Sequence, residues 1–456
     1  DASPDASTAR LSAGVLYADQ LHRLGDSIDR FNSVLSVDSG SLEARRRLAQ
    51  MLGLANRNHE AQAHLVALVR LGNISHLELL LLILGEETID SAEVLEPFRS
   101  AAPSDPHPLI ALARLASQSD DTIEAGRLLE QAIAEDGKLV EPVVRLGELL
   151  VKTGDLRGLL KWERELVTAG VREHPGCQVV RGDMFRLADA PRRAAVCYLE
   201  AVRLDPNRPE ACYRLGRILV GLGDTQQATV FLERARRVEA YVQAAKVAES
   251  AEAFDDLIRW SRELGLSWEE YAWSGLQIRV RPEDRSLVEK LPQLVEALKG
   301  LPLQRTRPGA NPAGGLDLSS YPDPELDAEL IARLARPPGP GTGVVDVEIR
   351  FEEISERAGL DFRFVNGARR PEDIRFMYQT TGGGVGVVDF DHNGWPDLWW
   401  TQGTTRPTDS DGSHSDVLYL NTGDGQLLDV SLQAGITESR FSQGLAVGDV
   451  DCGGLP

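Results

Sequence analysis

The sequence predicts a multidomain α and β protein, in which an N-terminal α-solenoid precedes a smaller β segment built from repeated units. Three observations support this fold class. Apolar residues recur with helical spacing over about the first 300 residues, prolines and glycines interrupt the pattern between 301 and 343, and short β-favouring runs flank an Asp-rich loop near the C-terminal end. A chain of 456 residues also exceeds what one core usually supports. We therefore expect parts at 1–300, 301–343 and 344–456.

The helical part consists of paired segments with regular spacing. Segments of about a dozen residues with apolar positions at i, i+3, i+4 and i+7 alternate with breaks such as Gly-Asp and Asp-Pro. Small residues recur on the first segment of each pair, the later ones 34 or 35 residues apart, at Ala18, Ala49, Ala113, Gly147, Gly182 and Gly216. The second segments share the period, as Tyr198 and Leu232 illustrate. This spacing predicts helix pairs that cross at small residues.

A helix-turn-helix period of this length resembles the tetratricopeptide (TPR) repeat. We count seven helix pairs between about 10 and 239, of which the third, at about 73–106, fits least, and we expect an atypical helical cap up to about 300. The resemblance implies a solenoid whose concave groove, lined by first helices, binds a protein or peptide. Arg47, Arg145 and Arg214 fall at equivalent places on first helices, where they would bind a partner's carboxylate, and a solvated surface is the alternative.

The stretch from 301 to 343 differs in composition from the parts on either side. It contains eight prolines and several glycines, which interrupt any helical pattern. We therefore predict a linker here, with one short helix at 324–335.

An Asp-rich loop lies between two short apolar runs in the β segment. Calcium takes about six to eight oxygen ligands, and a short loop supplies them from alternate side chains and a backbone carbonyl. The residues that would supply them are Asp389, Asp391, Asn393 and Asp397 through their side chains and Trp395 through its carbonyl. Trp400 stands where an EF-hand has its closing Glu, so we predict a strand-loop-strand calcium site. The alternative is a metal-free turn, because Asp, Asn and Gly also favour turns.

Part of this loop recurs 60 residues later in the chain. Residues 444–451 repeat the pattern of 384–391, which places Asp449 and Asp451 where the first copy has its two leading aspartates. Gly453 stands where the pattern expects Asn or Asp, so the second copy departs from the first. Asp449 and Asp451 are nevertheless candidate ligands of a second metal site.

With the similarity of 351–360 to 427–436, these repeats make residues 350–456 resemble the FG-GAP/VCBS repeats of β-propellers, most closely those of bacterial ASPIC/UnbV and cartilage-acidic-protein-like proteins. The resemblance implies that the loop at 389–397 binds Ca²⁺, as the blade loops of that family do. A propeller closes with about four to eight blades, whereas this segment holds about one and a half repeats. We therefore expect a partial calcium-binding β-propeller and a chain that is a fragment of a longer protein.

Charge and hydropathy narrow the range of partners. The chain has 70 acidic and 49 basic residues, and 344–456 alone holds 19 acidic residues, eight arginines and no lysine. Such acidity disfavours nucleic acid and anionic membranes as partners. The longest apolar run, Leu77–Leu84, is too short to cross a bilayer, so we expect no transmembrane segment.

The positions of the cysteines and the lack of catalytic motifs favour a structural protein. Cys177, Cys197 and Cys212 occupy apolar helical positions, which favours buried thiols over disulfides. The sequence has no G-x-S-x-G elbow, no P-loop and no H-E-x-x-H motif, and its eight histidines are scattered. We therefore expect a protein that is not an enzyme.

The predicted function is a non-catalytic scaffold that binds a protein or peptide through its TPR repeats and carries a Ca²⁺-stabilised β-propeller. We expect it to act outside the cell or in a bacterial envelope or periplasm. Two alternatives stay open. One is an accessory protein or enzyme of a biosynthetic pathway, as the UnbV-like resemblance implies. The other is a carbohydrate-binding or adhesion module in which Trp395, Trp399 and Trp400 form a sugar platform.

Overall fold

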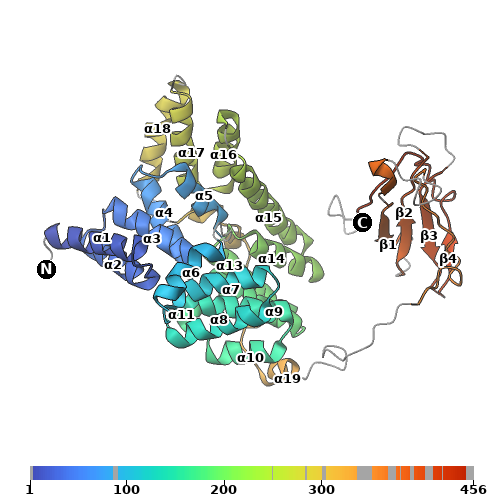
Figure 1. The fold of residues 1–456 in the computed structure, drawn as a ribbon, viewed down its shortest axis with the longest axis horizontal. Coiled ribbons are helices and arrows are strands. Elements are labelled where there is room, and N and C mark those ends of the chain that lie inside the picture. The colour runs from blue at the N-terminus through green and yellow to red at the C-terminus, as the bar shows by residue number, and fades with distance from the viewer. Residues whose placement is uncertain are drawn as a thin grey trace. The chain divides into compact units, whose positions relative to one another are not determined.

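The computed structural model of the chain divides into two compact units, residues 1–343 and 344–456 (Figure 1). The residues that the structure describes are 4–85, 91–248, 250–282, 285–299, 304–335, 352–367, 376–380, 382–390, 395–405, 414–423 and 425–447.

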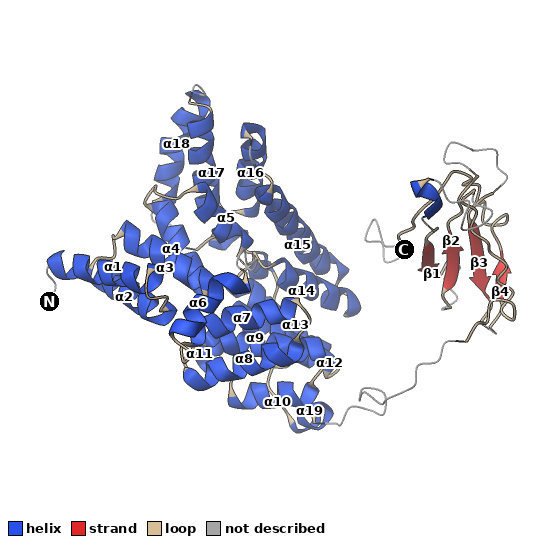
Figure 2. Cartoon of the chain, in the orientation of Figure 1, coloured by secondary structure: helices blue, strands red, loops and turns tan. Residues whose placement is uncertain are grey.

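The N-terminal unit is helical, as Figure 2 shows. Its helices are α1 (Pro4–Asp19), α2 (Leu24–Val37), α3 (Leu42–Leu54), α4 (Asn58–Arg70), α5 (His76–Leu84), α6 (Ala92–Ala101), α7 (Pro106–Gln118), α8 (Thr122–Glu135), α9 (Val140–Thr153), α10 (Leu156–Glu165), α11 (Ala169–Arg172), α12 (Pro175–Leu187), α13 (Pro191–Leu204), α14 (Pro209–Gly221), α15 (Thr225–Lys246), α16 (Ala251–Leu264), α17 (Ser267–Val280), α18 (Arg285–Leu298) and α19 (Ala328–Leu334). Two 3-10 turns, η1 (Pro308–Ala310) and η2 (Pro312–Gly315), precede α19.

Most of these helices pack as consecutive hairpins. The packed pairs are α1 with α2, α3 with α4, α7 with α8, α9 with α10, α12 with α13, α14 with α15 and α16 with α17. Six of the seven pairs predicted between about 10 and 239 are therefore present as hairpins, and α16 to α18 occupy the region where a helical cap is expected. The unit is a mostly helical, solenoid-like stack.

Small residues set the distance between the two helices of a pair. A Cβ added at Gly182 would lie 2.3 Å from a ring carbon of Tyr198, and one at Gly147 would lie 2.7 Å from the Trp162 ring. The Tyr198 hydroxyl also donates a 2.7 Å hydrogen bond to Asp183, which fixes the ring in place. These contacts explain why glycine occupies these two predicted crossings, because any side chain there would displace a buried aromatic ring.

The third predicted pair differs from the others. α5 packs against α4, α15 and α17, whereas α6 packs against α7. The sequence of α5, HLELLLLIL, is apolar on nearly every face, and such a helix needs more cover than one hairpin partner gives. Leu79 of α5 consequently lies in one buried cluster with Tyr241 and Trp273. Helices α4 and α5 thus bring the N-terminal part of the helical unit into contact with α15 and α17.

Because α5 packs against α15 and α17, the first repeats contact α7 directly. Asp105, which precedes α7, accepts hydrogen bonds from the backbone N–H groups of Gly25 (2.7 Å) and His107 (3.0 Å). Arg114 of α7 donates a 2.6 Å hydrogen bond to the side-chain oxygen of Asn56. These polar contacts tie α2 and the α3–α4 turn to α7 across the place that a regular third hairpin would occupy.

Residues 304–335, which we call the strap, pack along the helices of the same unit. Gly265 has a φ of +73°, and a Cβ there would lie 2.2 Å from Ala310, so this glycine permits the close approach of the strap. Five apolar strap residues are buried in the core that contains α9 to α15: Ala313, Leu316, Leu318, Leu330 and Leu334. The stretch predicted as a linker thus belongs, over 304–335, to the helical unit, and the short helix expected at 324–335 is α19. Prolines interrupt helices there without preventing the burial of leucines between them.

The C-terminal unit contains a small antiparallel sheet with the strand order β1-β2-β3-β4. Its strands are β1 (Val385–Val388), β2 (Asp397–Trp400), β3 (Val417–Asn421) and β4 (Leu427–Asp429), and a 3-10 turn, η4 (Met377–Thr380), precedes β1. Val385 pairs with Trp400 and Val388 with Asp397, so β1 and β2 are the strands predicted on either side of the Asp-rich loop. The described residues of this unit form one sheet, and a propeller therefore stays a prediction.

The two repeated segments of the C-terminal unit lie against each other. A Cβ added at Gly384 would lie 2.6 Å from the backbone nitrogen of Leu445, and one at Gly386 would lie 2.5 Å from the Leu445 side chain. The glycines of the first copy therefore allow close approach of the second copy, whose pattern begins at Gly444.

The helix crossings lead to a stability prediction. We expect Gly182→Ala to lower the free energy of unfolding by about 1–3 kcal/mol, because the new methyl group overlaps the fixed Tyr198 ring. Gly275→Ala is the matched control, since a Cβ at Gly275 in α17 meets nothing within 4 Å. This control should be neutral or stabilising by up to about 1 kcal/mol. Urea unfolding measures both changes, and equal effects of the two substitutions would contradict close packing at Gly182.

Candidate functional site

The three predicted partner-binding arginines lie on first helices, as expected from their repeat positions. Arg47 is on α3, Arg145 on α9 and Arg214 on α14. Each lies four residues after a glutamate and pairs with it: Arg47 with Glu43 at 3.1 Å, Arg145 with Glu141 at 2.7 Å and Arg214 with Glu210 at 2.6 Å. The three guanidinium groups therefore share one internal arrangement.

Each arginine also has a second carboxylate partner within the chain. Arg47 lies 3.4 Å from Asp19 on α1, and Arg214 pairs with Asp183 on α12, so both link the first helices of neighbouring repeats. Arg145 pairs at 2.9 Å with Glu148 on its own helix. These arginines stabilise the stack as they stand. To bind a partner's carboxylate, each would have to exchange an internal one.

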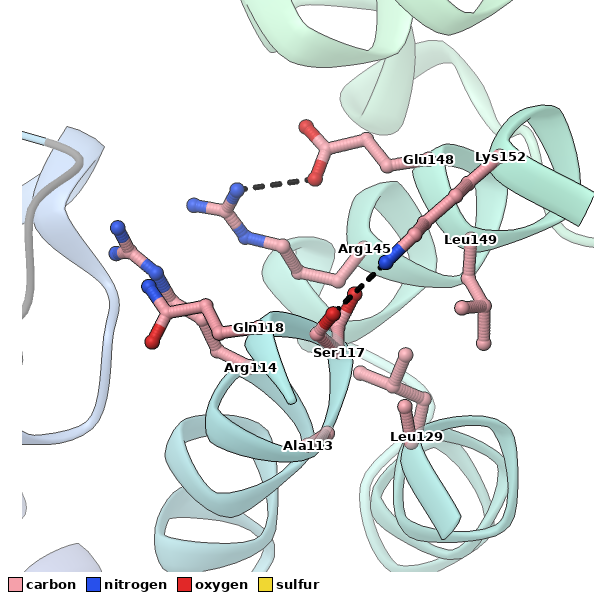
Figure 3. A pocket seen from close by; sticks show the side chains of 10 residues that line it. Ala113, Arg114, Ser117, Gln118, Leu129, Arg145, Glu148, Leu149 and Lys152 are labelled. Carbon is pink, nitrogen blue, oxygen red and sulfur yellow. Dashed lines mark hydrogen bonds and ion pairs between the residues drawn. The ribbon is translucent and has the colours of Figure 1, made fainter. Parts of the chain in front are cut away.

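A pocket opens beside Arg145 between α7, α8 and α9 (Figure 3), with a volume of about 240 Å³. Its lining residues are Ala113, Arg114, Ser117, Gln118, Ala125, Leu129, Arg145, Glu148, Leu149 and Lys152. We call it the α7–α9 pocket. Arg47 and Arg214 lie on other helices and do not line it. The structure thus brings only one of the three predicted arginines to this pocket.

Cationic side chains outnumber carboxylates among the residues that line the α7–α9 pocket. Arg114, Arg145 and Lys152 line it against a single carboxylate, Glu148, whereas the whole chain has a formal net charge of −21. The ammonium of Lys152 donates to the Ser117 carbonyl at 2.8 Å, as Figure 3 shows, and pairs with Asp120 at 2.6 Å. Asp120 and Glu141, which lie outside the lining, offset two of these charges, so an anionic ligand would bind by exchange with an internal carboxylate.

The contact with Asp120 leaves Lys152 the most available of these cations. The hydrogen bond and charge of Lys152 lower the pKa of Asp120, yet the side chains are 42% and 85% exposed. Ion pairs between exposed groups contribute little to stability, so a carboxylate from a partner can replace Asp120 with small loss. Arg145, by contrast, is only 14% exposed and holds the 4% exposed Glu141.

The floor of the α7–α9 pocket is aliphatic. Leu129 of α8 and Leu149 of α9 form it together with Ala113 and Ala125. A floor of this kind binds an apolar side chain by removing it from water, while the surrounding polar groups fix its orientation. The pocket is therefore suited to a peptide that places an aliphatic side chain next to a carboxylate.

The residues Arg114 and Lys152 were not among those predicted from the sequence. Arg114 follows Ala113, and Lys152 lies five residues after Gly147, so both are displaced from the small residues that mark the repeat. Their position in a pocket depends on the packing of α7 against α9, which the repeat spacing alone does not fix.

A second polar cleft lies between α4 and the turn that joins α13 to α14. Two adjoining cavities of about 250 and 230 Å³ share His59, Gln62, Asp205, Asn207 and Arg305. Groups of both charges line this cleft, so it selects neither anions nor cations by charge.

The predicted calcium loop is described only in part. Asp389, Trp395 and Asp397 lie within the described residues, whereas Asp391, Asn393, Asp449 and Asp451 lie outside them. The carboxylate of Asp397 is fully buried and accepts backbone hydrogen bonds from Phe390 and Asn421, both at 2.7 Å. It therefore ties the start of the loop and the end of β3 to β2.

The donor chemistry of Asp397 is compatible with metal binding. Each of its oxygens accepts one N–H group, and a carboxylate offers about four lone-pair positions, so it can also bind a cation. Across the described segments, no three His, Cys, Asp or Glu residues are grouped closely enough to hold a metal ion. The predicted ligand set is not covered by that finding, because half of its side-chain donors lie outside the described residues.

The tryptophans of the sugar-platform alternative do not share one surface. Trp399 and Trp400 are successive residues of β2, and successive strand residues point to opposite faces of a sheet. The Trp400 ring packs on Phe362 at a centroid distance of 5.1 Å, and the Trp399 indole donates to Asp416 at 3.4 Å. Trp395 is 52% exposed. A three-ring platform is therefore not formed.

The cysteines confirm the expectation of buried thiols. Cys177, Cys197 and Cys212 are free and buried, and burial raises the pKa of each thiol to about 12. Thiols with such pKa values are inert near neutral pH. Among the described helices, none is both long enough and apolar enough to cross a membrane.

Comparison with known proteins agrees with a helical-repeat fold. The model of the tetratricopeptide repeat family matches residues 209–240, which cover α14 and most of α15. No curated protein sequence matches the chain. The N-terminal unit therefore contains a TPR within a mostly helical stack.

Several solved structures are similar to the chain at low identity. A thermophilic TPR protein of Thermus thermophilus is 18% identical with a TM-score of 0.27, covering 42% of this chain and 99% of that one. Pseudomonas aeruginosa PilF is 16% identical with a TM-score of 0.27, covering 48% of this chain and 97% of that one. The Cut9–Hcn1 tetramer gives 11% identity and a TM-score of 0.35, covering 64% of this chain and 56% of that one.

The glutamate–arginine pairs lead to a second stability prediction. We expect Glu141→Gln to lower the free energy of unfolding by about 1–3 kcal/mol, because it removes a buried partner of Arg145. Glu43→Gln is the matched control at the equivalent position, where the glutamate side chain is 48% exposed. It should cost less than about 1 kcal/mol. Thermal and urea unfolding measure both, and a larger loss for the Glu43 variant would refute this ranking.

Proposed function

We propose that the chain is a non-catalytic protein-interaction scaffold and that a peptide segment of its partner binds in the α7–α9 pocket. The observation that carries this proposal is the combination of Arg114, Arg145 and Lys152 above an aliphatic floor. The TPR match at 209–240 supports a protein-interaction role for the helical unit. The partner segment is expected to carry an acidic residue beside an aliphatic one.

The cationic residues have different roles in this proposal. Lys152 binds the partner's carboxylate, since its exposed contact with Asp120 is readily exchanged. Arg145 keeps its two internal glutamates and holds the rim of the pocket in shape. Arg47 and Arg214 remain candidate contacts for other parts of the same partner, provided that the partner displaces Asp19 or Asp183.

For the C-terminal unit we propose a structural calcium site. Its ligands would be Asp389, Asp391, Asn393 and Asp397 with the carbonyl of Trp395, and Asp449 and Asp451 would belong to a second loop. Asp397 supports the proposal, because it already anchors both sides of the loop that the ion would order. A calcium-stabilised unit of this acidity suits an extracellular or bacterial envelope location, which we propose for the protein.

The peptide proposal predicts a selective loss of binding. We expect the full chain, panned against a display library of short random peptides, to enrich Asp or Glu next to Leu, Ile or Val. The Arg114→Ala/Lys152→Ala variant should lose at least tenfold in affinity for the enriched peptides, because about 1.4 kcal/mol of binding free energy is lost.

Lys299→Ala is the matched control for this measurement, because Lys299 is an exposed lysine that directly follows α18 and pairs with Glu296 of that helix. It should leave the affinity unchanged. Enriched peptides without acidic residues, or equal affinity of all three proteins, would rule out the pocket as the binding site.

The calcium proposal predicts a metal-dependent melting temperature. Calcium at 100 times its dissociation constant should stabilise the C-terminal unit by about 2.7 kcal/mol, and a chelator should remove this gain. Asp391→Ala should abolish the calcium response and leave the chelated protein unchanged. Asp397→Asn should lower stability even with chelator, because it weakens two buried backbone hydrogen bonds. Calorimetric titration and melting with and without chelator measure these effects. A wild-type chain without calcium heat or chelator response would leave the loop a metal-free turn.

A further inference from the structure

The strap has two halves that are held in different ways. In the first half the Arg305 guanidinium pairs at 2.7 Å with Glu269, which is fully buried. The Asn311 amide donates to the carbonyls of Val202 and Arg203 at the end of α13, at 3.2 and 3.1 Å. Leu316 and Leu318 are buried in the core of the helical unit. Residues 305–318 are therefore an integral part of the fold.

The second half, residues 321–335, is held by arginines of the helical stack and by two buried leucines, Leu330 and Leu334, and we call it the latch. Arg193 of α13 donates to the Asp323 carbonyl at 3.0 Å and pairs with Asp327 at 2.7 Å. Arg172 of α11 pairs with Glu325 at 3.0 Å. The Glu325 and Asp327 side chains are 64% and 46% exposed. Exposed ion pairs of this kind exchange readily with water and with other carboxylates.

One polar contact of the latch involves a buried guanidinium. Arg181 of α12 is 3% exposed, pairs with Glu163 and donates a 2.6 Å hydrogen bond to the Pro324 carbonyl. If the latch left, this guanidinium would lose an acceptor. Glu163 and Gln178 would still bond the group, and the freed N–H would be available to an occupant that offers an oxygen atom.

The apolar part of the latch is one short helix. α19 has seven residues, begins at the capping carboxylate of Asp327 and buries Leu330 and Leu334, with α10 as a neighbour. A helix of this length is unstable away from its partner surface. The latch therefore has a structure only while it is bound, as a peptide ligand does.

We propose that the latch is a displaceable internal ligand and that the surface beneath it, formed by α10 to α13, docks acidic segments of other proteins. The arginines require carboxylates and carbonyls, and the site of α19 requires two leucines four residues apart behind a capping Asp. A partner segment with these features replaces the latch contact by contact. The surface is distinct from the α7–α9 pocket, so this proposal does not depend on peptide binding there.

The tether explains why such a partner needs the latch to open. A segment on the same chain competes at an effective concentration on the order of millimolar, so a free segment of equal intrinsic affinity binds weakly to the closed protein. Weakening the latch should therefore raise the affinity for a segment added in trans.

The probe for this test is a fluorescent synthetic peptide with the sequence of residues 319–335. We expect the full chain with Leu330→Ala/Leu334→Ala to bind it at least tenfold more tightly than the wild type, by fluorescence anisotropy. Adding Arg193→Ala to that variant should weaken binding about fivefold, because the peptide then lacks the partner of its Asp327. A scrambled peptide should not bind, and Arg259→Ala, an exposed arginine of α16, should not change the affinity.

Asp327→Ala, which removes the cap of α19 and the Arg193 pair, is a milder way to open the latch and guards against misfolding of the double variant. It should also tighten peptide binding, with unchanged helical circular dichroism. If both variants keep their helical content and bind the peptide no more tightly than the wild type, the latch is a fixed part of the fold and the proposal is overturned.

Discussion

A pair of short amphipathic helices cannot bury its own apolar face, so each part of the helical unit depends on a neighbour that covers it. Within the stack the neighbour is the next helix, and small residues set the distance, as Gly147 does against Trp162. Where the stack is irregular, other segments take that place, because α5 turns to α15 and α17 while the strap covers parts of α10 and α13. One requirement thus explains both the regular and the irregular parts.

The regular part of the fold could be predicted from the sequence, because the small residues that permit helix crossings recur at a constant period. The irregular parts could not. α5 fits a repeat by its position, and only its apolar composition indicates that it needs more than one neighbour. In the strap, Leu316 and Leu318 stand among prolines and glycines without a helical period, so composition predicts a linker, and their burial depends on tertiary contacts.

The candidate site was predictable to a smaller extent. The glutamates four residues before Arg47, Arg145 and Arg214 could have been read as helical ion-pair partners. The pairing of Arg47 with Asp19 and of Arg214 with Asp183 could not be predicted, because it depends on how neighbouring helices pack. The strands around the Asp-rich loop were predicted by their apolar runs. The predicted calcium ligands remain a prediction, since the set extends beyond the described residues.

Residues 304–335 cover the helical stack instead of linking two domains. Hydrogen exchange of the intact chain, compared with an isolated peptide of the same residues, measures this most directly. The structure bonds the amides of Arg307 to Gly265, Leu330 to Asp327 and Ala335 to Ile331. These amides should exchange many times more slowly in the chain than in the peptide. Equal exchange rates over 304–335 in the two samples would contradict the account.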